Sequence, residues 1–356
     1  MLDQVAVGAV ATAGGVAIVG TALSLLRSKA WWVRIWDFPR LQVAVLGIAA
    51  LGGWLHLAGW EETHERAFAA VLGVAVLFQS ALIWRYTRLA PREVQRSETD
   101  DPARQVTLVM CNVLQTNRDA ERLLRVVQAR DPDVVLCVET DEWWRGRLDV
   151  LERDRPHVLR CPLPNTYGML LYSRLPLDES QIDFLVEDDI PSMQARLVLR
   201  NGTRIWLNCV HPRPPAPGEA DESLERDAEL LVVGKRVRGA PGPVIVCGDL
   251  NDVAWSRSTR LFQKVSRLLD PRKGRGFYAT FHASYPGLRW PLDHVFFSDD
   301  FRLVEMQRLP NSGSDHFPVY LALSHEPPAA AEQEAPESDA EDLDEAHETV
   351  AEARGR

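Results

Sequence analysis

Two segments in the second half of the chain combine side chains that suit chemistry on phosphate esters. In the first, an apolar, β-branched run predicts a buried strand that delivers Asp249 and Asn251 to its end, where a carboxylate and an amide can emerge into a cleft. In the second, Asp315 precedes His316, whose imidazole has an unperturbed pKa near neutrality. Together these side chains suggest metal-assisted hydrolysis of a phosphoester.

Two earlier strands are expected to end in polar side chains of the same kind. The apolar run 106–113 carries Asn112 near its end, and the run 134–138 is followed by Glu139. Ligands collect at the carboxyl ends of strands in sheet proteins, so both positions are candidates for a site. Glu139 is the best candidate ligand for a hard divalent ion such as Mg²⁺, which takes few carboxylates and keeps several waters.

These segments belong to a set of six whose order along the chain resembles the endonuclease/exonuclease/phosphatase superfamily. That superfamily includes deoxyribonuclease I type nucleases, abasic-site endonucleases, inositol polyphosphate 5-phosphatases and neutral sphingomyelinases. The resemblance covers roughly residues 104–323, and six segments in one order are far more specific than any one of them. The six are Cys111-Asn112-Val113, Val138-Glu139-Thr140, Val210-His211-Pro212, Gly248-Asp249-Leu250-Asn251, Leu292-Asp293-His294 and Ser314-Asp315-His316.

The resemblance implies the fold class, a four-layered α/β sandwich in which two packed mixed β-sheets are flanked by helices. Expected strands and helices alternate along the same region, which fits that architecture. A last group of strands is expected near residues 277–281, 292–297, 302–308 and 317–323.

The resemblance also implies roles for the side chains near the ion. Asp249 would orient or deprotonate the attacking water, and Asn251 would hold a phosphate oxygen or the ion. Asn112 would contact the ion or a phosphate oxygen beside Glu139, and Asp315 would be a second carboxylate near the ion.

The histidines divide into catalytic and structural candidates. His316 would contact the phosphate or pass a proton, with Asp293 fixing its tautomer as a buried carboxylate does for a catalytic imidazole. His211 matches the other family histidine and would stabilise the phosphorane or protonate the leaving group. His294 follows Asp293 on an alternating strand, so it is expected to face the other way and to be structural. Tyr172 lies in a strand that often contributes a site residue in relatives, with a core position as the alternative.

The first part of the chain contains three apolar stretches close to the ~20 residues that a helix needs to cross a bilayer. They span residues 5–26, 41–60 and 67–84, and tryptophans lie at or near their ends, as in an interfacial aromatic belt. A cleaved signal peptide is the alternative for the first stretch, but that stretch stays apolar for longer than such a region does. We therefore predict a transmembrane anchor of three helices over residues 1–84, with the lipid bilayer as its partner.

The short loops indicate an orientation, since Lys and Arg prefer the cytoplasmic side. Residues 27–40 carry four of these side chains and residues 61–66 carry one. This bias predicts a multi-pass protein of the cell membrane with a cytoplasmic catalytic domain. Some relatives with a similar three-span anchor are associated with resistance to cell-wall antibiotics, which implies an extracytoplasmic domain as the alternative.

Composition divides the rest of the chain. Residues 85–104 are polar and charged, which predicts a tether before a catalytic domain at 105–323. Residues 324–356 are rich in Ala, Glu, Asp and Pro, which predicts a disordered acidic tail. Residues 85–324 hold 34 acidic against 33 basic side chains, so the catalytic domain is nearly neutral. Near-neutrality argues against a dedicated DNA nuclease, although a local basic groove stays open.

Three functions therefore remain. The first is a membrane-anchored phosphatase or phosphodiesterase that depends on Mg²⁺, or on Mn²⁺, and acts on a membrane-associated substrate such as a lipid-linked phosphate. The second is a membrane-tethered nuclease acting on DNA or RNA. The third is a catalytically silent membrane scaffold, which the intact set of site residues disfavours. Nothing in the sequence indicates an obligate protein partner.

Overall fold

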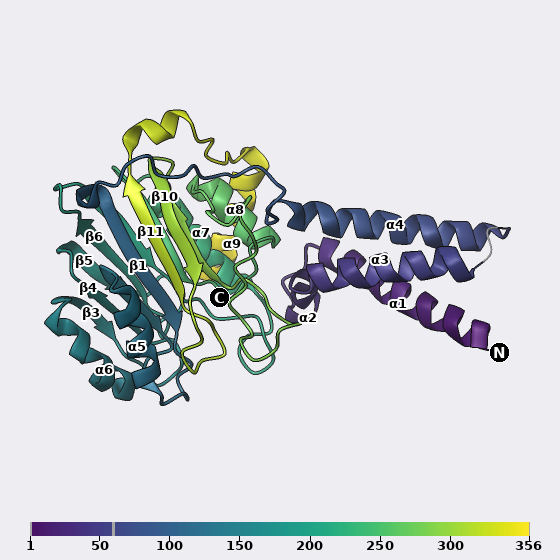
Figure 1. Cartoon of the computed structure of the whole chain (residues 1–356), viewed down its shortest axis with the longest axis horizontal. Helices are drawn as coiled ribbons and strands as arrows, with labels where there is room; N and C mark the ends of the chain where they lie inside the picture. The colour runs from purple at the N-terminus through teal and green to yellow at the C-terminus, as the bar shows by residue number, and fades with distance from the viewer. Residues whose placement is uncertain (1, 59–60, 356) are drawn as a thin grey trace. The chain divides into compact units, whose positions relative to one another are not determined.

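The computed structural model describes residues 2–58 and 61–355, which form two compact units (Figure 1). The first unit runs to Ala90 and also holds Pro215–Ser223; the second holds Pro91–Pro214 and the residues from Leu224 onward. Helices in the first unit are α1 (Leu2–Leu25), α2 (Trp31–Arg34), α3 (Arg40–Leu57) and α4 (Thr63–Trp84).

Three helices of the first unit are long and apolar enough to cross a membrane, over Gln4–Leu25, Arg40–Leu57 and Thr63–Trp84. The second of these ends at Leu57, short of the expected end at Trp60, which lies outside the described residues. The three helices pack through small side chains. Gly14 is one contact point, because a Cβ atom there would lie 2.7 Å from the ring of Phe68.

Gln79, the polar residue that interrupts the third apolar stretch, is buried inside this helix bundle. Its side-chain oxygen accepts a hydrogen bond from Arg40 (3.0 Å), and its nitrogen donates to the Thr21 hydroxyl (3.0 Å). A polar group that is satisfied within the bundle adds no cost to placing this helix in an apolar environment.

The second unit contains two mixed sheets. The first has the strand order β10-β11-β1-β2-β4-β3, and the second has the order β5-β6-β7-β8-β9. Among the strands that the structure describes, β1 with β2 and β7 with β8 are the parallel pairs, near the middle of each sheet. The strands are β1 (Gln105–Asn112), β2 (Val134–Val138), β3 (His157–Cys161), β4 (Met169–Ser173), β5 (Leu177–Asp183), β6 (Ser192–Val198), β7 (Arg204–Cys209), β8 (Val244–Asp249), β9 (Asp293–Phe297), β10 (Phe301–Arg308) and β11 (Val319–His325).

Helices cover the outer faces of both sheets, which confirms the four-layered sandwich (Figure 1). On the first sheet, α5 (Ala120–Arg130) and α6 (Glu142–Leu148) bury an apolar cluster that includes Leu123 and Trp144. On the second, α7 (Leu224–Arg238) and α8 (Arg257–Ser266) bury another that includes Phe262 and Phe296.

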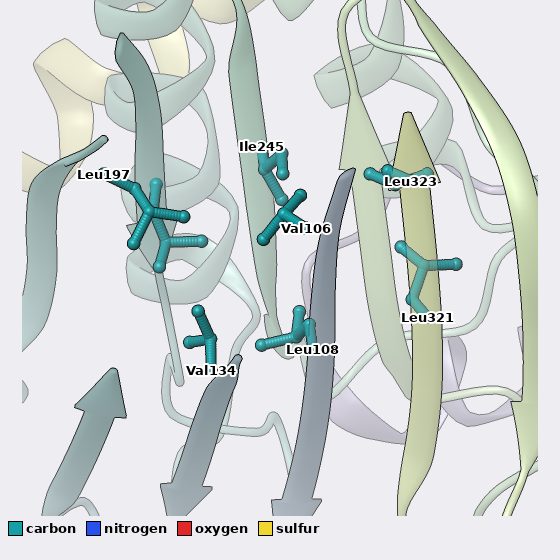
Figure 2. Close-up of a pocket in the computed structure, with 8 residues that line it drawn as sticks. Val106, Leu108, Val134, Leu197, Ile245, Leu321 and Leu323 are labelled. Atoms are coloured by element: carbon teal, nitrogen blue, oxygen red, sulfur yellow. The ribbon is translucent and has the colours of Figure 1, made fainter. Parts of the chain in front are cut away.

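The two sheets pack face to face through aliphatic side chains (Figure 2). The cavity left between them measures only about 10 Å³, which is barely the space of one water molecule. This interior is therefore closed to any substrate, and chemistry must take place at the rim of the sandwich. The cavity is lined by Val106, Leu108, Val134, Leu197, Leu207, Ile245, Leu321 and Leu323.

The C-terminal segment is folded, so the prediction of a disordered tail over 324–356 is wrong. Helix α9 (Ala340–Arg354) buries Ala346 and Val350 in an apolar cluster with α7 and α8. Its acidic face pairs with α8, where Lys264 contacts Asp342 (2.8 Å) and Arg257 contacts Glu345. Composition alone missed this helix because the basic partners of its carboxylates come from a distant segment.

The segment that follows α4 is also packed rather than loose, unlike the tether predicted at 85–104. Val94 is fully buried, and Glu93 forms an ion pair with Lys273 (2.6 Å). Gly274 leaves room for this segment, because a Cβ atom there would lie 2.5 Å from the carbonyl oxygen of Pro91. Residues 91–104 therefore belong to the second unit.

Candidate active site

Side chains at the ends of strands from both sheets meet at one site. Asn112 is the last residue of β1 and Asp249 the last of β8. Glu139 directly follows β2, Asp293 is the first residue of β9, and His316 lies three residues before β11. Apolar residues bury these strands, so the polar side chain at each end is held where the sandwich opens.

Asn112 links two of the carboxylates of the site, Glu139 and Asp249. Its Nδ2 donates to Glu139 Oε1 (2.6 Å) and to Asp249 Oδ2 (3.0 Å), while its Oδ1 accepts from the backbone of Leu114 (2.9 Å). Because Asn112 belongs to the first sheet and Asp249 to the second, these bonds join the two sheets at the site. The second oxygen of Glu139 accepts from the backbone of Gln115 (3.2 Å).

His316 extends this row of side chains. Its Nδ1 lies 2.8 Å from Asp293 Oδ2, and its Nε2 lies 3.6 Å from Asp249 Oδ2. The Ser314 hydroxyl accepts from the His316 backbone (3.0 Å), and the Phe281 ring packs 4.9 Å from the imidazole. Glu139, Asn112, Asp249, His316 and Asp293 thus form one connected row.

Burial and charge together set the protonation states of the row. Burial by itself lowers the pKa of His316, but Asp293 and Asp249 outweigh it and raise that pKa to about 10. Burial raises the pKa of Glu139 to about 7, against the hydrogen bond from Asn112. Burial likewise raises the pKa of Asp249, against the charge of His316. His316 is therefore an imidazolium at neutral pH.

His211, two residues after β7, is the second imidazole of the site. Burial lowers its pKa to about 4, so it is neutral at physiological pH. Among the described residues its Nδ1 has no hydrogen-bond partner, and the Tyr167 ring lies 5.5 Å away. The charges of Asp249 and His316 act on His211, which places it beside the row.

The sequence of residues 110–316 matches the model of the Endonuclease/Exonuclease/phosphatase family. The chain belongs to this family. It is accordingly a phosphoester hydrolase, and enzymes of this family use divalent metal ions. A comparison with curated protein sequences finds no match.

Solved structures share the family fold at low sequence identity. The structure of D. rerio TDP2 complexed with single strand DNA product is 17% identical (TM-score 0.52), covering 62% of this chain and 99% of that chain. The endonuclease/exonuclease/phosphatase from Beutenbergia cavernae DSM 12333 is 20% identical (TM-score 0.51), and the match covers 63% of this chain and 72% of that chain. The human Nocturnin catalytic domain with bound sulfate is 18% identical (TM-score 0.51), and the match covers 66% of this chain and 99% of that chain.

Two more residues of the family motifs lie at the edge of the row. Asn251 has a left-handed backbone (φ 51°), and its Nδ2 donates to the carbonyl of Pro212 (3.0 Å), next to His211. The Asp315 carboxylate accepts from the Ser314 hydroxyl (3.2 Å) and contributes to the raised pKa of His316.

Tyr172 and His294 lie outside the row: Tyr172 takes the core position, and His294 faces away from His316 as the alternation predicted. Tyr172 is buried on the helix-covered face of the first sheet, with its hydroxyl on Asp149 (3.0 Å). His294 contacts Arg272 (2.7 Å) and the backbone of Asp252 (2.8 Å) rather than His316.

Backbone geometry in this family site depends on one glycine. Gly248 has φ 153°, and a Cβ atom there would lie 1.8 Å from the carbonyl oxygen of Val210, the neighbour of His211. Only glycine allows β8 to approach the end of β7 this closely. Glu139 has φ 60°, which is uncommon for a residue with a long side chain and is typical of functional positions.

Sequence patterns did not identify Phe281 or Tyr167 as neighbours of the site histidines. Phe281 was expected in a strand over 277–281, but that segment has only isolated bridges from Phe281 to Trp290 and His316. Positive φ angles at Gly276 and Tyr278 prevent a regular strand there. An aromatic ring in an irregular segment carries no signal that it packs against a distant imidazole.

Proposed function

We propose that this chain is a membrane-anchored, divalent-metal-dependent phosphoesterase in which the row from Glu139 to Asp293 activates water. The observation that carries the proposal is the continuous contact between the buried carboxylates of Asp249 and Asp293, the half-buried Glu139 and an imidazolium at the rim of the sandwich. A silent scaffold has no need to keep so many charged groups buried together, since each costs free energy unless it is compensated.

The charges of the row suit a divalent cation. The three carboxylates of Glu139, Asp249 and Asp293 are opposed by one imidazolium, and burial without full compensation raises the pKa of Glu139. We assign the ion to Glu139 and Asn112, with Asp315 as a further carboxylate. Mg²⁺ suits these oxygen donors, and Mn²⁺ is accepted in its place. Such an ion polarises a phosphoryl oxygen and lowers the pKa of bound water.

A second grouping of donors exists, since Asp249, Asp293 and His316 offer ligand atoms within 4.8 Å of one another. We assign these three to proton transfer instead. The Nδ1 of His316 is occupied by Asp293, and a protonated ring cannot bind a cation. Asp249 takes the proton of the attacking water, because burial raises the pKa of its carboxyl toward that of an effective base.

The two histidines serve the phosphoryl group and the leaving oxygen. His316, held as an imidazolium, donates a hydrogen bond to the phosphoryl oxygens, where negative charge develops. His211 is neutral, so it stabilises the phosphorane and the leaving oxygen by a hydrogen bond without giving up a proton, and Asn251 holds a phosphate oxygen.

The deciding experiment uses the full-length protein in detergent with Mg²⁺, offering lipid pyrophosphate and plasmid DNA in parallel, and Asp249→Ala as the blank. Phosphate release alone supports a phosphatase of membrane-associated substrates, which the three apolar helices favour. Nicking alone supports a tethered nuclease. Silence on both substrates and on bis(p-nitrophenyl) phosphate would contradict the proposal.

Replacing Glu139 tests the assignment of the ion. Glu139→Gln keeps the size of the side chain but removes the negative charge, so we expect the Mg²⁺ concentration for half-maximal activity to rise about tenfold or more. High Mg²⁺ should restore part of kcat, because the proton-transfer groups remain. A half-maximal Mg²⁺ concentration equal to that of the wild type would place the ion elsewhere.

A nucleic-acid substrate is the second candidate, because the catalytic unit carries a basic groove. Between α5 and the segment after β10 lies a groove of about 600 Å³ whose charged lining residues are Arg122, Arg125 and Arg130. Arg130 pairs with Glu305 (2.7 Å), whereas Arg122 and Arg125 are exposed and have no acidic partner in the described part of the chain. D. rerio TDP2, which shares the fold, is complexed with single strand DNA product.

Salt dependence distinguishes this candidate. The measurement is the slope of log affinity against log salt concentration for a single-stranded oligonucleotide. Each lost phosphate contact should flatten this slope by ~0.7, so the double variant Arg122→Ala with Arg125→Ala should flatten it by about 1.4 if the groove binds the strand. Arg153→Ala, an exposed arginine on the chain beyond α6, is the matched control and should leave the slope unchanged. Equal slopes for all proteins would exclude the groove as a strand-binding site.

A further inference from the structure

Buried side chains connect the segment after α4 to the loop that follows Asp249 at the end of β8 and contains Asn251 and Asp252. Three residues form its centre: Asp270, Arg272 and His294, called the strap below. All three are buried, at 0%, 1% and 0% exposure. They lie entirely within the catalytic unit and outside the row of site residues.

Arg272 is held from one side by Asp270. Its Nε and Nη2 donate to the two oxygens of that carboxylate, each at 2.8 Å, and the backbone of Arg272 donates to the same group (2.9 Å). This charge outweighs the effect of burial and lowers the pKa of Asp270. A bidentate pair of this kind fixes the guanidinium plane as well as its position.

The contacts of His294 define its tautomer. Arg272 Nη2 lies 2.7 Å from His294 Nδ1, and a guanidinium can only donate, so Nδ1 accepts. The other nitrogen, Nε2, therefore carries the proton and donates to the carbonyl of Asp252 (2.8 Å). Burial and the charge of Arg272 lower the pKa of His294 well below its usual value, which keeps the ring neutral.

A second buried arginine holds the neighbouring carbonyl of the same loop. Arg226 of α7 donates from Nη1 to the carbonyl of Asn251 (2.9 Å), and its Nη2 lies 3.4 Å from the Asp252 carboxylate. Two successive carbonyls of the loop are thus fixed by donors from two different elements. Asn251 keeps its left-handed backbone between them.

The position of this loop determines the orientation of Asp249. The backbone N–H of Asn251 donates to Asp249 Oδ1 (2.9 Å), while Asn112 donates to Oδ2. If the carbonyl of Asp252 were released, the Asn251 N–H could turn away and the carboxylate would lose one of these two bonds. The effect of the strap on chemistry therefore passes through the backbone of residues 251 and 252.

We propose that Asp270, Arg272 and His294 are positioning residues that hold the Asp249 carboxylate in its working orientation. This inference rests on the proposed function of the site. The strap also reaches the segment after α4, because Glu93 accepts from the backbone of Asp270 (2.7 Å) and from Lys273 (2.6 Å). The chain that leaves the last apolar helix is thereby attached to the residues that position the general base.

Two substitutions of His294 separate positioning from simple packing. His294→Gln can accept from Arg272 with its oxygen and donate to Asp252 with its nitrogen, whereas His294→Leu can do neither. Val244→Ala is the matched control, since it removes buried methyl groups at the other end of β8, away from the loop. Arg272→Lys, which cannot bridge Asp270 and His294 with a planar fork, replaces His294→Leu if that variant does not fold.

The measurements use the full-length protein in detergent. For His294→Leu we expect a kcat on bis(p-nitrophenyl) phosphate lower by about tenfold or more at unchanged KM, and faster hydrogen exchange in residues 249–253. The Kd for Mn²⁺ by calorimetry should stay within about twofold of the wild type, because the ion is assigned to Glu139, Asn112 and Asp315. His294→Gln should restore both kcat and hydrogen exchange to within about threefold of the wild type. Val244→Ala should lower Tm alone.

The outcomes for these variants decide whether the strap positions Asp249. The inference is overturned if His294→Leu loses thermal stability as Val244→Ala does but keeps wild-type kcat and hydrogen exchange. If the wild type hydrolyses no phosphoester, the proposed function fails separately, and hydrogen exchange in residues 249–253 still tests the strap.

Discussion

Asp249→Ala is expected to lower kcat by about 10³-fold or more while the protein stays folded. Asp249 contacts both Asn112 (3.0 Å) and His316 (3.6 Å), so it is the central member of the row. Its side chain is fully buried, and burial raises the pKa of its carboxyl, as suits a base that takes a proton from water. Removing it eliminates the base and leaves the imidazolium without one of its two carboxylates.

The matched control for Asp249 is Asp133, another buried acid on the same sandwich. Asp133 precedes β2, at the end opposite Glu139, and pairs with Arg200 (2.5 Å). Asp133→Asn should lower Tm, because a buried carboxylate loses its charge pairing with the exposed Arg200, and should leave kcat within about twofold of the wild type. The measurement is kcat and KM on bis(p-nitrophenyl) phosphate with saturating Mg²⁺. A comparable loss of kcat in both variants would show that the effect of Asp249→Ala is structural.

Local pattern places Asn112, Glu139 and Asp249 at strand ends, and the order of the six motifs is what selected them as site candidates. An apolar run predicts a buried strand, and a polar side chain at its end must lie where the sheet stops. The alternation rule also separated Asp293 from His294, whose partners in the structure differ as expected. The sandwich followed from the same strands together with the family motifs.

The features that the sequence did not reveal depend on partners far apart along the chain. Helix α9 is stabilised by residues of α8 about 80 positions earlier, as in the pair of Lys264 with Asp342. The packing of Phe281 on His316 and the ion pair of Glu93 with Lys273 also join residues that are far apart along the chain. Composition describes a segment as if it were alone, so it cannot show which distant charge or ring will stabilise that segment.

Asp293→Asn is the second substitution with a large expected effect, and we expect kcat to fall by about 10²-fold to 10⁴-fold. Asp293 Oδ2 accepts from His316 Nδ1 at 2.8 Å, which fixes the imidazole plane and stabilises its charged form. Its other oxygen is buried without a hydrogen-bond partner among the described residues. An amide in its place keeps the shape but cannot balance the positive charge.

The control is a histidine and aspartate pair of the same chemistry at the end of β11. His325 Nε2 lies 3.4 Å from Asp300 Oδ2, away from the site. Asp300→Asn should therefore leave kcat unchanged. Equal losses in Asp293→Asn and Asp300→Asn would remove the special role assigned to Asp293.

The dependence on pH gives the Asp293 prediction a second test with a definite sign. In the wild type, Asp293 and Asp249 raise the pKa of His316 from 6.5 to about 10, so the imidazolium persists across the neutral range. A raised histidine pKa contributes stability that is fully present below pH 6.5 and is lost as pH rises through about 10. The Tm difference between wild type and Asp293→Asn should therefore shrink as pH rises from 6 toward 10. In a plot of log kcat against pH, the alkaline limb should also move to lower pH in the variant, because its His316 loses the proton more easily. A limb at the wild-type pH would mean that Asp293 does not stabilise the imidazolium.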